Sequence, residues 1–567
     1  MFIDARTVPD SEIIETDICI IGAGAAGITL AREFSGQPFQ VSLLESGDLE
    51  FDGETQSLYD GENVGLPYFP LRGPRLRYFG GTTNHWGGYC QPFNALDFEK
   101  RDYVPYSGWP IERHELDVYY ERAIDILGLD PEAWNIDFWR EKDRFPTWPF
   151  MGERVTNVVS QLSPGDVRRF GKTYRDDVVH AANVTTYLNA NVTQIETDET
   201  GKRVTRVHVA CLSGSNFSVI PKIVILAAGG IENARILLLS NKQWPAGLGN
   251  QNDLVGRFFM EHPRFVAGKI VPANPFISTG FYGLHKVGQI RLRGYLSLSP
   301  EVQRQEQVTD VNARLLPMFS ETFINSFKSE NVRSLRLLVR ALQSGKMLDQ
   351  FGSHLGRVIA DLSSWQKLFL AGAPVPLPNP VVATEIMKAL PGGEEALLTS
   401  YLGDISVFAL EEIFNGLPVE YIEVKTRVES APNPNSRLTL SSERDALGQN
   451  RLQLDWQLDP LDRYSARRTL EVMGVELGRA GLGRMQIELD DEAWPDDLAG
   501  GSHHMGTTRM SKDPKQGVVD ENSRLHGLSN MYIAGSSVFP TSGSGTPTLT
   551  LLALALRLAD HLKEKLA

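Results

Sequence analysis

A glycine-rich turn between a buried strand and a helix limits what the N-terminal part of this chain can fold into. Residues 17–21 (DICII) are typical of a buried strand, and residues 22–27 (GAGAAG) follow at once and lead into an apolar helical run. In this pattern the first glycine makes a tight turn, the second admits a pyrophosphate, and the third lets the helix pack on the strand. A second strand at 41–44 ends in Glu45, where a carboxylate can bind the ribose hydroxyls of a dinucleotide. The predicted phosphate-side contacts are Gly22, Gly24, Ala25 and Gly27.

The order of strand, glycine-rich turn and following segment recurs later in the chain. Residues 222–226 (KIVIL) precede a Leu-rich helix that begins with AAGG, and residues 531–534 (MYIA) precede Gly535. Strands far apart in sequence can join one parallel sheet, so we expect one nucleotide domain built from separated segments. The predicted boundaries are 1–100, 185–262 and 501–567 for this domain, and 101–184 and 263–500 for a substrate-binding domain.

Alternating and helical patterns predict the elements between these segments. Strands are expected at 184–197 and 203–209, with Gly201 in the turn between them. Further strands at 420–428 and 437–440 are expected in the sheet of the substrate-binding domain. Apolar positions at helical spacing predict a helical insertion between about 325 and 372.

Charge and cysteine content exclude several kinds of partner. The 567 residues carry a formal net charge of −14 without a basic run, which disfavours nucleic acid because phosphate binding needs a positive surface. Three cysteines are too few for a disulfide framework or a zinc site, so no metal is predicted. The acidic N-terminus lacks an apolar signal segment, and no stretch reaches the ~18 apolar residues of a spanning helix. We therefore expect a cytoplasmic protein without a membrane span, although export with a signal-bearing partner stays open.

Two adjacent histidines stand in the C-terminal segment, which reads GSHHMGTTRM from Gly501. Histidine exchanges protons near neutral pH, which suits it to general acid–base catalysis. A run rich in Gly, Ser and Thr follows from 534, and a long apolar helix begins at Pro547. A helix N-terminus offers unpaired N–H groups and a partial positive charge. The segment thus combines proton-exchanging side chains with a place for a bulky, partly anionic ligand.

The chain resembles the glucose–methanol–choline (GMC) family of FAD-dependent oxidoreductases. Within that family it is most similar to the branch of pyranose oxidase and the large subunits of gluconate and fructose dehydrogenases. The resemblance is weak to absent between about 265 and 415. The motifs that carry it are GAGAAG at 22–27, Glu45, FGGTTNHWGG at 79–88, GWP at 108–110, AAGGIENARILLLS at 227–240, HHMGTTRM at 503–510 and AGSSVFPTSG at 534–543.

The resemblance implies FAD rather than NAD, and an α/β fold that is α+β overall. A Rossmann-like FAD-binding domain would be assembled from discontinuous segments, beside a substrate domain with an antiparallel sheet and a helical insertion. In pyranose oxidase the histidine that matches His85 is joined covalently to the flavin. In dehydrogenases of this branch it only packs beside the ring, and both alternatives stay open here. The further implied FAD contacts are Gly80, Gly81, Thr82, Thr83, Asn84, His85, Ala228, Gly229, Gly535, Ser536, Thr546 and Thr548.

The resemblance also implies that His503 takes the substrate hydroxyl proton while hydride passes to flavin N5. The second catalytic position of the family, usually His or Asn, is Thr546 here, and threonine cannot act as a base at neutral pH. Thr546 could orient the substrate and leave His503 as the sole base. Alternatively, another residue such as His504 supplies the partner, or the chemistry differs.

The predicted function is therefore oxidation of a hydroxyl group of a sugar, glycoside or polyol. Electrons would pass from the reduced flavin to O₂ or to a quinone or haem partner. The alternative is a flavin-containing lyase or biosynthetic tailoring enzyme with no or different net redox chemistry. A homo-oligomer or a complex with a small subunit is compatible with the sequence.

Overall fold

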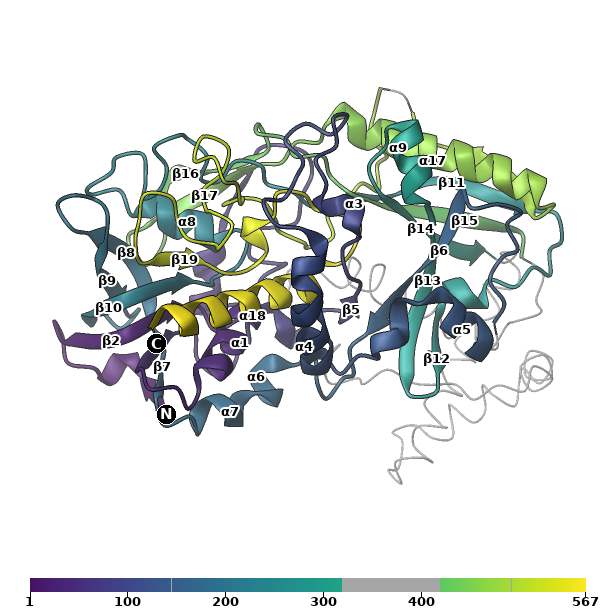
Figure 1. The fold of residues 1–567 in the computed structure, drawn as a ribbon. Coiled ribbons are helices and arrows are strands. Elements are labelled where there is room, and N and C mark those ends of the chain that lie inside the picture. Colours follow the sequence, from purple (N-terminus) through teal and green to yellow (C-terminus); the bar gives the residue numbers. More distant parts are fainter. Residues whose placement is uncertain (144, 319–418, 491, 567) are drawn as a thin grey trace, which may run out of the picture.

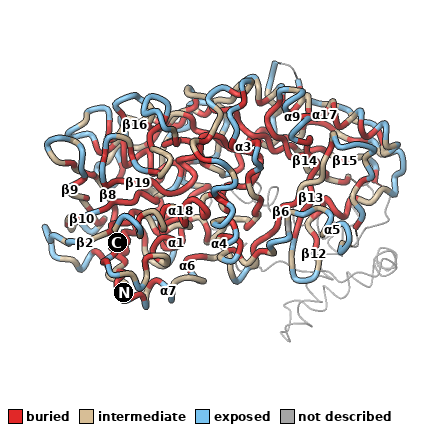
Figure 2. The backbone as a smooth tube through the Cα atoms, in the orientation of Figure 1, coloured by how far each residue is buried: buried red, intermediate tan, exposed pale blue. Residues whose placement is uncertain are grey.

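The computed structural model describes residues 1–143, 145–318, 419–490 and 492–566. Its strands form two large sheets that lie at opposite ends of an elongated molecule. Helices pack on these sheets, and loops join them (Figure 1). Buried backbone runs through both sheets and the region between them, while exposed residues lie in peripheral loops (Figure 2). The predicted helical insertion at 325–372 lies outside the described residues.

The first large sheet contains all the strands that precede the predicted glycine turns. Strands β1, β7, β3, β2, β10 and β19 pair in parallel, whereas β9 and β8 extend the sheet in antiparallel fashion. Strand β2 ends in a run of buried residues, as expected of a parallel strand covered on both faces. The strand bounds are β1 Phe2–Asp4, β2 Ile13–Ile21, β3 Val41–Leu44, β7 Val184–Leu188, β8 Asn191–Thr197, β9 Val204–Ala210, β10 Asn216–Leu226 and β19 Met531–Ile533.

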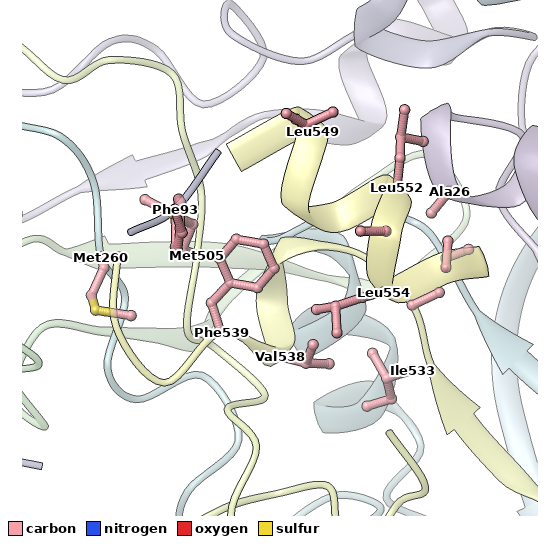
Figure 3. Packing of buried hydrophobic residues seen from close by; sticks show 14 of the residues in the cluster. Ala26, Phe93, Met260, Met505, Ile533, Val538, Phe539, Leu549, Leu552 and Leu554 are labelled. Carbon is pink, nitrogen blue, oxygen red and sulfur yellow. The ribbon is translucent and has the colours of Figure 1, made fainter. Parts of the chain in front are cut away.

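The strands of this sheet end in register, which brings the separated turns together. Leu226 of β10 pairs with both Ile21 of β2 and Ile533 of β19, and Ile21 also pairs with Leu44 of β3. The residues that follow these strands therefore meet at one edge, where ligands of open α/β sheets bind. Helix α18 (Pro547–Leu566) lies against α1 (Ala25–Phe34) beside this edge (Figure 1). Leucines of α18 pack toward Ala26 and Ile533 (Figure 3).

The second large sheet is antiparallel throughout. Its order is β18-β11-β15-β14-β13-β6-β5, and β12 pairs with β13. Helix α17 packs on it, starting at Pro460 after Asp459 caps the first turn. The bounds are β5 Tyr89–Cys90, β6 Val155–Leu162, β11 Arg264–Pro272, β12 Leu284–Val287, β13 Ile290–Leu298, β14 Val311–Met318, β15 Tyr421–Val428, β18 Gly483–Ile487 and α17 Pro460–Arg479.

A third, three-stranded sheet corrects one prediction. The strand predicted at 437–440 is β16 (Arg437–Arg444), and it pairs with β17 (Asn450–Asp455) and β4 (Gly61–Asn63) rather than with the large antiparallel sheet. Strand β16 contacts helix α8 (Glu232–Leu239) next to the nucleotide sheet. The buried Arg235 guanidinium ties them together through Glu232 and Asp445. Alternation predicted the strand correctly but says nothing about which sheet it joins.

The mixed architecture confirms the predicted α/β fold class, while the exact domain boundaries stay a prediction. None of the described helices is long and apolar enough to cross a membrane. The remaining helices are α2 Gly53–Gln56, α3 Ala95–Phe98, α4 Asp117–Leu127, α5 Ile136–Lys142, α6 Phe170–Thr173, α7 Arg175–Val179 and α9 Pro300–Glu306, with short 3₁₀ turns that include η3 Gly81–Asn84 and η8 Ser536–Val538.

Candidate active site

Two glycines of the first turn are required by close backbone contacts. Gly22 has a φ of +101°, and a Cβ there would lie 2.8 Å from the carbonyl oxygen of Ala227. A Cβ at Gly27 would lie 1.9 Å from the carbonyl oxygen of Gly22. The first glycine therefore permits the turn, and the third lets helix α1 approach the end of β2.

Other glycines border open space at the same edge. A Cβ at Gly24, Gly229 or Gly535 would meet nothing within 4 Å. Gly24 is the N-terminal cap of α1, so the free N–H groups of that helix face this space. A Cβ at Gly81 would lie 3.2 Å from the Cα of Gly24, so the loop around η3 borders the first turn. This backbone cradle has the shape and the donors that a dinucleotide pyrophosphate needs.

Glu45 lies beside the first turn, as predicted. One carboxylate oxygen accepts a hydrogen bond from the N–H of Ala23 and the other from the N–H of Gly47, each at 2.9 Å. Burial raises the pKa of this carboxyl group, while the two backbone donors act in the opposite direction. A carboxylate has about four acceptor positions, so two remain for ribose hydroxyls.

Several predicted contacts use their side chains to shape the loop itself. The Thr83 hydroxyl donates to the carbonyl of Gly80, and the Asn84 amide donates to the carbonyl of Phe79. The Thr82 hydroxyl oxygen accepts from the N–H of Leu76. These residues would therefore contact a cofactor mainly through their backbone atoms. His85 follows them, and burial together with the charge of Arg169 lowers its pKa to about 4, so its ring is neutral at pH 7.

The remaining predicted contacts lie on the same edge or on α18. The N–H of Ala228 donates to the side chain of Asn233, which also holds the carbonyl of Ala534. The Ser536 hydroxyl donates to the carbonyl of His504 at 2.6 Å. Ala25 and Thr548 occupy the first turns of α1 and α18.

The predicted base His503 contacts a histidine that the sequence analysis did not identify. Its Nδ1 lies 2.7 Å from Nδ1 of His262. The contact follows from backbone register, because Met260 and Met505 form an antiparallel bridge and residues 262 and 503 are therefore opposite each other. Figure 3 shows Met260 and Met505 on these neighbouring segments. In the sequence, the charged residues around His262 (EHPR at 261–264) are the one signal that could indicate a functional histidine there.

The hydrogen bonds of His262 define the proton positions on both rings. Its Nε2 lies 2.7 Å from the carbonyl oxygen of Gly543 and 3.2 Å from that of Ser542. A carbonyl only accepts, so Nε2 of His262 carries the proton. Burial and nearby guanidinium groups lower the pKa of His262 to about 3, so the ring is neutral and its Nδ1 is an acceptor. Nδ1 of His503 is then the donor, and Nε2 of His503 keeps a free lone pair.

A buried carboxylate holds the two histidine segments together. One oxygen of Glu261 accepts from the N–H of His503 at 2.7 Å and from that of His262 at 3.0 Å. Its other oxygen accepts from the hydroxyl of Tyr68 at 2.7 Å. The Tyr68 oxygen in turn lies 2.9 Å from Nε2 of His504, whose ring stacks on Phe259. His504 thus belongs to the support of the site, and the histidine partner of His503 is His262.

Thr546 is buried, and its hydroxyl donates to the carbonyl of Tyr89 at 2.7 Å. A hydroxyl has a single proton, so Thr546 offers a substrate or cofactor its oxygen as an acceptor and its backbone. The structure brings Thr546 into the loop that also supplies the carbonyls bound by His262. His503 thus keeps a basic nitrogen, Nε2, that its histidine partner does not occupy.

Comparisons with known proteins agree with this geometry. A family model described as GMC oxidoreductase matches residues 432–555, and one described as FAD dependent oxidoreductase matches residues 17–243. The 6'''-hydroxyparomomycin C oxidase of Streptomyces lividus is 30% identical over 96% of this chain and 92% of its own length. The 2-methyl-1,2-propanediol dehydrogenase of Mycolicibacterium austroafricanum is 24% identical over 97% of this chain and 96% of its own. The structure of formate oxidase from Aspergillus oryzae RIB40 has the same fold, with a TM-score of 0.52, 16% identity and coverage of 98% and 99% of the two chains. The predicted cofactor, FAD, is confirmed.

Alanine at two glycines of the first turn should separate folding from cofactor binding. Gly27→Ala places a methyl group 1.9 Å from a backbone carbonyl, so we expect loss of FAD together with a lower melting temperature of the apoprotein. Gly24→Ala has open space for its methyl group, so we expect a normal melting temperature of the apoprotein but weaker FAD binding. Thermal unfolding of the stripped proteins and FAD titration measure the two properties. Equal FAD affinity in Gly24→Ala and the unchanged protein would contradict the placement of the pyrophosphate.

Proposed function

The chain belongs to the GMC family of FAD-dependent oxidoreductases, which act on CH–OH donors, and on this basis we propose that it oxidises a hydroxyl group of a sugar, glycoside or polyol. Bound FAD supplies the hydride acceptor at its N5 atom. His503 takes the proton of the substrate hydroxyl. Electron transfer from the reduced cofactor to O₂, or to a quinone or haem partner, completes the proposed cycle.

The free lone pair on Nε2 of His503 is the observation that carries this proposal. The carbonyl of Gly543 fixes the proton on Nε2 of His262, and His262 in turn fixes the proton of His503 on Nδ1. His503 is partly exposed, whereas the adjacent His504 is buried. An imidazole held in one tautomer, with the basic nitrogen available, is the arrangement that a general base needs.

The protonation state of His503 also suits this role. Burial lowers its pKa well below the usual value of 6.5, and the charges of Arg264 and Arg427 lower it further. The ring is therefore neutral at pH 7 and can accept a proton. The same shift keeps the base from being blocked by solvent protons in mildly acidic solution.

Of the three interpretations of Thr546, the hydrogen bonds favour His503 as the sole base. The Thr546 hydroxyl is committed to Tyr89, and His262 fills the place of a histidine partner without having a free basic nitrogen. His262 is thus a positioning residue. The lyase alternative requires no hydride transfer, and turnover with fully oxidised flavin would identify it.

Anaerobic mixing of the holoenzyme with sugars, glycosides and polyols tests the proposal directly. We expect at least one compound to bleach the flavin absorbance, and His503→Ala to slow that reduction by about 10²- to 10⁴-fold while the protein stays yellow. His504→Gln is the matched control, since it changes the adjacent histidine, and its effect should be much smaller. A panel without any bleaching by the unchanged enzyme would contradict the proposed oxidation.

The role of His262 is measurable in the pH dependence of flavin reduction. Only neutral His503 acts as a base, and its lowered pKa places the acidic limb of the rate profile below pH 6.5. His262→Ala leaves Nδ1 of His503 without its acceptor. We expect a rate about 10- to 100-fold lower and an acidic limb shifted to lower pH, because the protonated imidazole loses a hydrogen-bond acceptor. His262→Gln retains an acceptor oxygen and should restore part of the rate, and a loss of rate at an unchanged limb would point to a merely structural role.

Acid precipitation decides between the two roles open to His85. His85 ends η3, whose Gly81 borders the first turn, and we expect the FAD colour to remain in the supernatant after the protein is precipitated. Colour in the pellet that His85→Ala releases would instead assign a covalent link to this histidine.

A further inference from the structure

Two arginines lie directly opposite each other on neighbouring strands near the proposed base. Arg264 of β11 and Arg427 of β15 are paired in the antiparallel register. Like charges at directly opposed positions destabilise a sheet, and they are usually separated or neutralised by a carboxylate. Within the described part of the chain, the hydrogen-bond acceptors of the two guanidinium groups are neutral: the carbonyl of Gly501 for Arg264 and the amide oxygen of Gln91 for Arg427.

Burial makes this arrangement costly. Arg427 is only 8% exposed, and its guanidinium stacks on the ring of Tyr295. The Nε atoms of both Arg264 and Arg427 are buried and have no hydrogen-bond partner among the described residues. A buried charge without a hydrogen-bonded counter-charge is destabilising, so the buried Arg427 and the half-buried Arg264 beside it would both gain from an anion bound between them.

The nearby buried carboxylates accept hydrogen bonds from groups other than the two arginines. Glu261 lies close enough to Arg264 to interact with its charge, but its oxygens accept from the backbones of His262 and His503 and from the hydroxyl of Tyr68. Glu429 is bound by the guanidinium of Arg101 through two hydrogen bonds and also accepts from the N–H of Asp310. Asp310 itself accepts from the side chains of Ser297 and Ser544. Burial raises the pKa of Asp310 while the charge of Arg427 acts in the opposite direction, so this carboxyl group lies near the pair, although its hydrogen bonds go to other residues.

Further guanidinium groups add positive charge near the arginine pair. Burial alone would raise the pKa of the Tyr295 hydroxyl, yet the guanidinium groups of Arg293, Arg427 and Arg314 lower it below its usual value. Arg293 and Arg427 stand on the same large sheet as Arg264. A positive potential therefore extends over this part of the sheet.

The arginine pair lies at the proposed catalytic histidine. A Cβ built on Gly501 would lie 2.9 Å from Nη2 of Arg264 and 3.0 Å from Nδ1 of His503, so both groups border one backbone position. Arg264 and Arg427 both act on the pKa of His503, which requires proximity. Gln91, which accepts from Arg427, also accepts from Asn312, and Asn312 donates to the carbonyl of Ser544 in the buried C-terminal loop.

We propose that Arg264 and Arg427 bind an anionic group of the substrate, so that the hydroxyl compound oxidised at His503 carries a carboxylate or a phosphate elsewhere in the molecule. The inference rests on the proposed function and narrows its substrate class. A guanidinium presents planar N–H donors that match either anion, and a desolvated contact of this kind discriminates strongly against a neutral group. The unpartnered Nε atoms are donors that such a group would satisfy.

Matched compounds test the proposal on the holoenzyme. D-Glucose, D-glucuronate and D-glucose 6-phosphate share a ring and differ at one carbon, and propane-1,2-diol with lactate forms a smaller pair. Dissociation constants come from flavin difference spectra, or from the concentration dependence of anaerobic reduction where the compound is oxidised. We expect an anionic member to bind about 10-fold or more tightly than its neutral counterpart. Comparison of glucuronate with the phosphate distinguishes the two anions.

Substitutions then show whether the arginine pair causes the preference. Arg427→Met and Arg264→Met should each bring the ratio of neutral to anionic dissociation constants close to one, while Arg427→Lys keeps a charge and should retain part of the ratio. Arg291→Met is the matched control, since it removes one positive charge from an exposed position at the start of β13 and should leave the ratio unchanged. Retained flavin colour verifies that each variant is folded.

The outcomes separate this inference from the proposed function. Equal binding of neutral and anionic members, no binding of any member, or a ratio that survives both methionine variants would overturn the anion site. If neutral members bind and bleach the flavin without any preference for anions, the proposed oxidation stays intact. Conversely, anions that bind through the arginine pair in an enzyme that none of these compounds reduces would support the anion site and count against the proposed oxidation.

Discussion

One buried carboxylate holds the two halves of the site in place. Glu261 has no exposed surface and accepts three hydrogen bonds, from the backbones of His262 and His503 and from the hydroxyl of Tyr68. Three donors satisfy much of a buried carboxylate's need for solvation, and removal of any of them would leave an expensive polar group. The contact joins segments that are far apart in sequence. It fixes the register that sets the two imidazoles opposite each other, and it places the start of β11, with Arg264, at the same point.

The nucleotide sheet solves a different problem, which is access for a large cofactor. Four parallel strands end in register, so their following turns face one space instead of being spread along the sheet. Glycine serves two purposes there. At Gly22 and Gly27 it allows backbones to touch, whereas at Gly24 and Gly535 the lack of a side chain leaves room. Residues 531–547 are all buried. They lead from this edge of the sheet to the carbonyl groups that orient His262.

What could be predicted from sequence follows from how local each interaction is. Gly22, Gly27 and Glu45 lie within one strand–turn–helix unit, and the fingerprint spacing is enough to predict where they lie, while their contacts with FAD stay a prediction. His262 could not be assigned because its contact with His503 depends on the bridge between Met260 and Met505. The commitment of Thr546 to Tyr89 is equally non-local. Adjacent side chains can also have different partners. His503 and His504 are neighbours in sequence, but His503 contacts His262 while His504 contacts Tyr68, so the two do not form a catalytic pair with each other.

The arginine pair and the base are coupled through charge, and this coupling has a direction. Burial and the charges of Arg264 and Arg427 lower the pKa of His503 and so make it a weaker base. A general base is most effective when its pKa is near the working pH. An anion held between Arg264 and Arg427 would offset their charges and raise the pKa of His503 toward that range. Under the anion proposal, a substrate that carries a carboxylate or a phosphate therefore raises the pKa of the base that takes its hydroxyl proton. A neutral alcohol occupying the same place would leave the base weak, so selectivity would arise in the proton-transfer step as well as in binding.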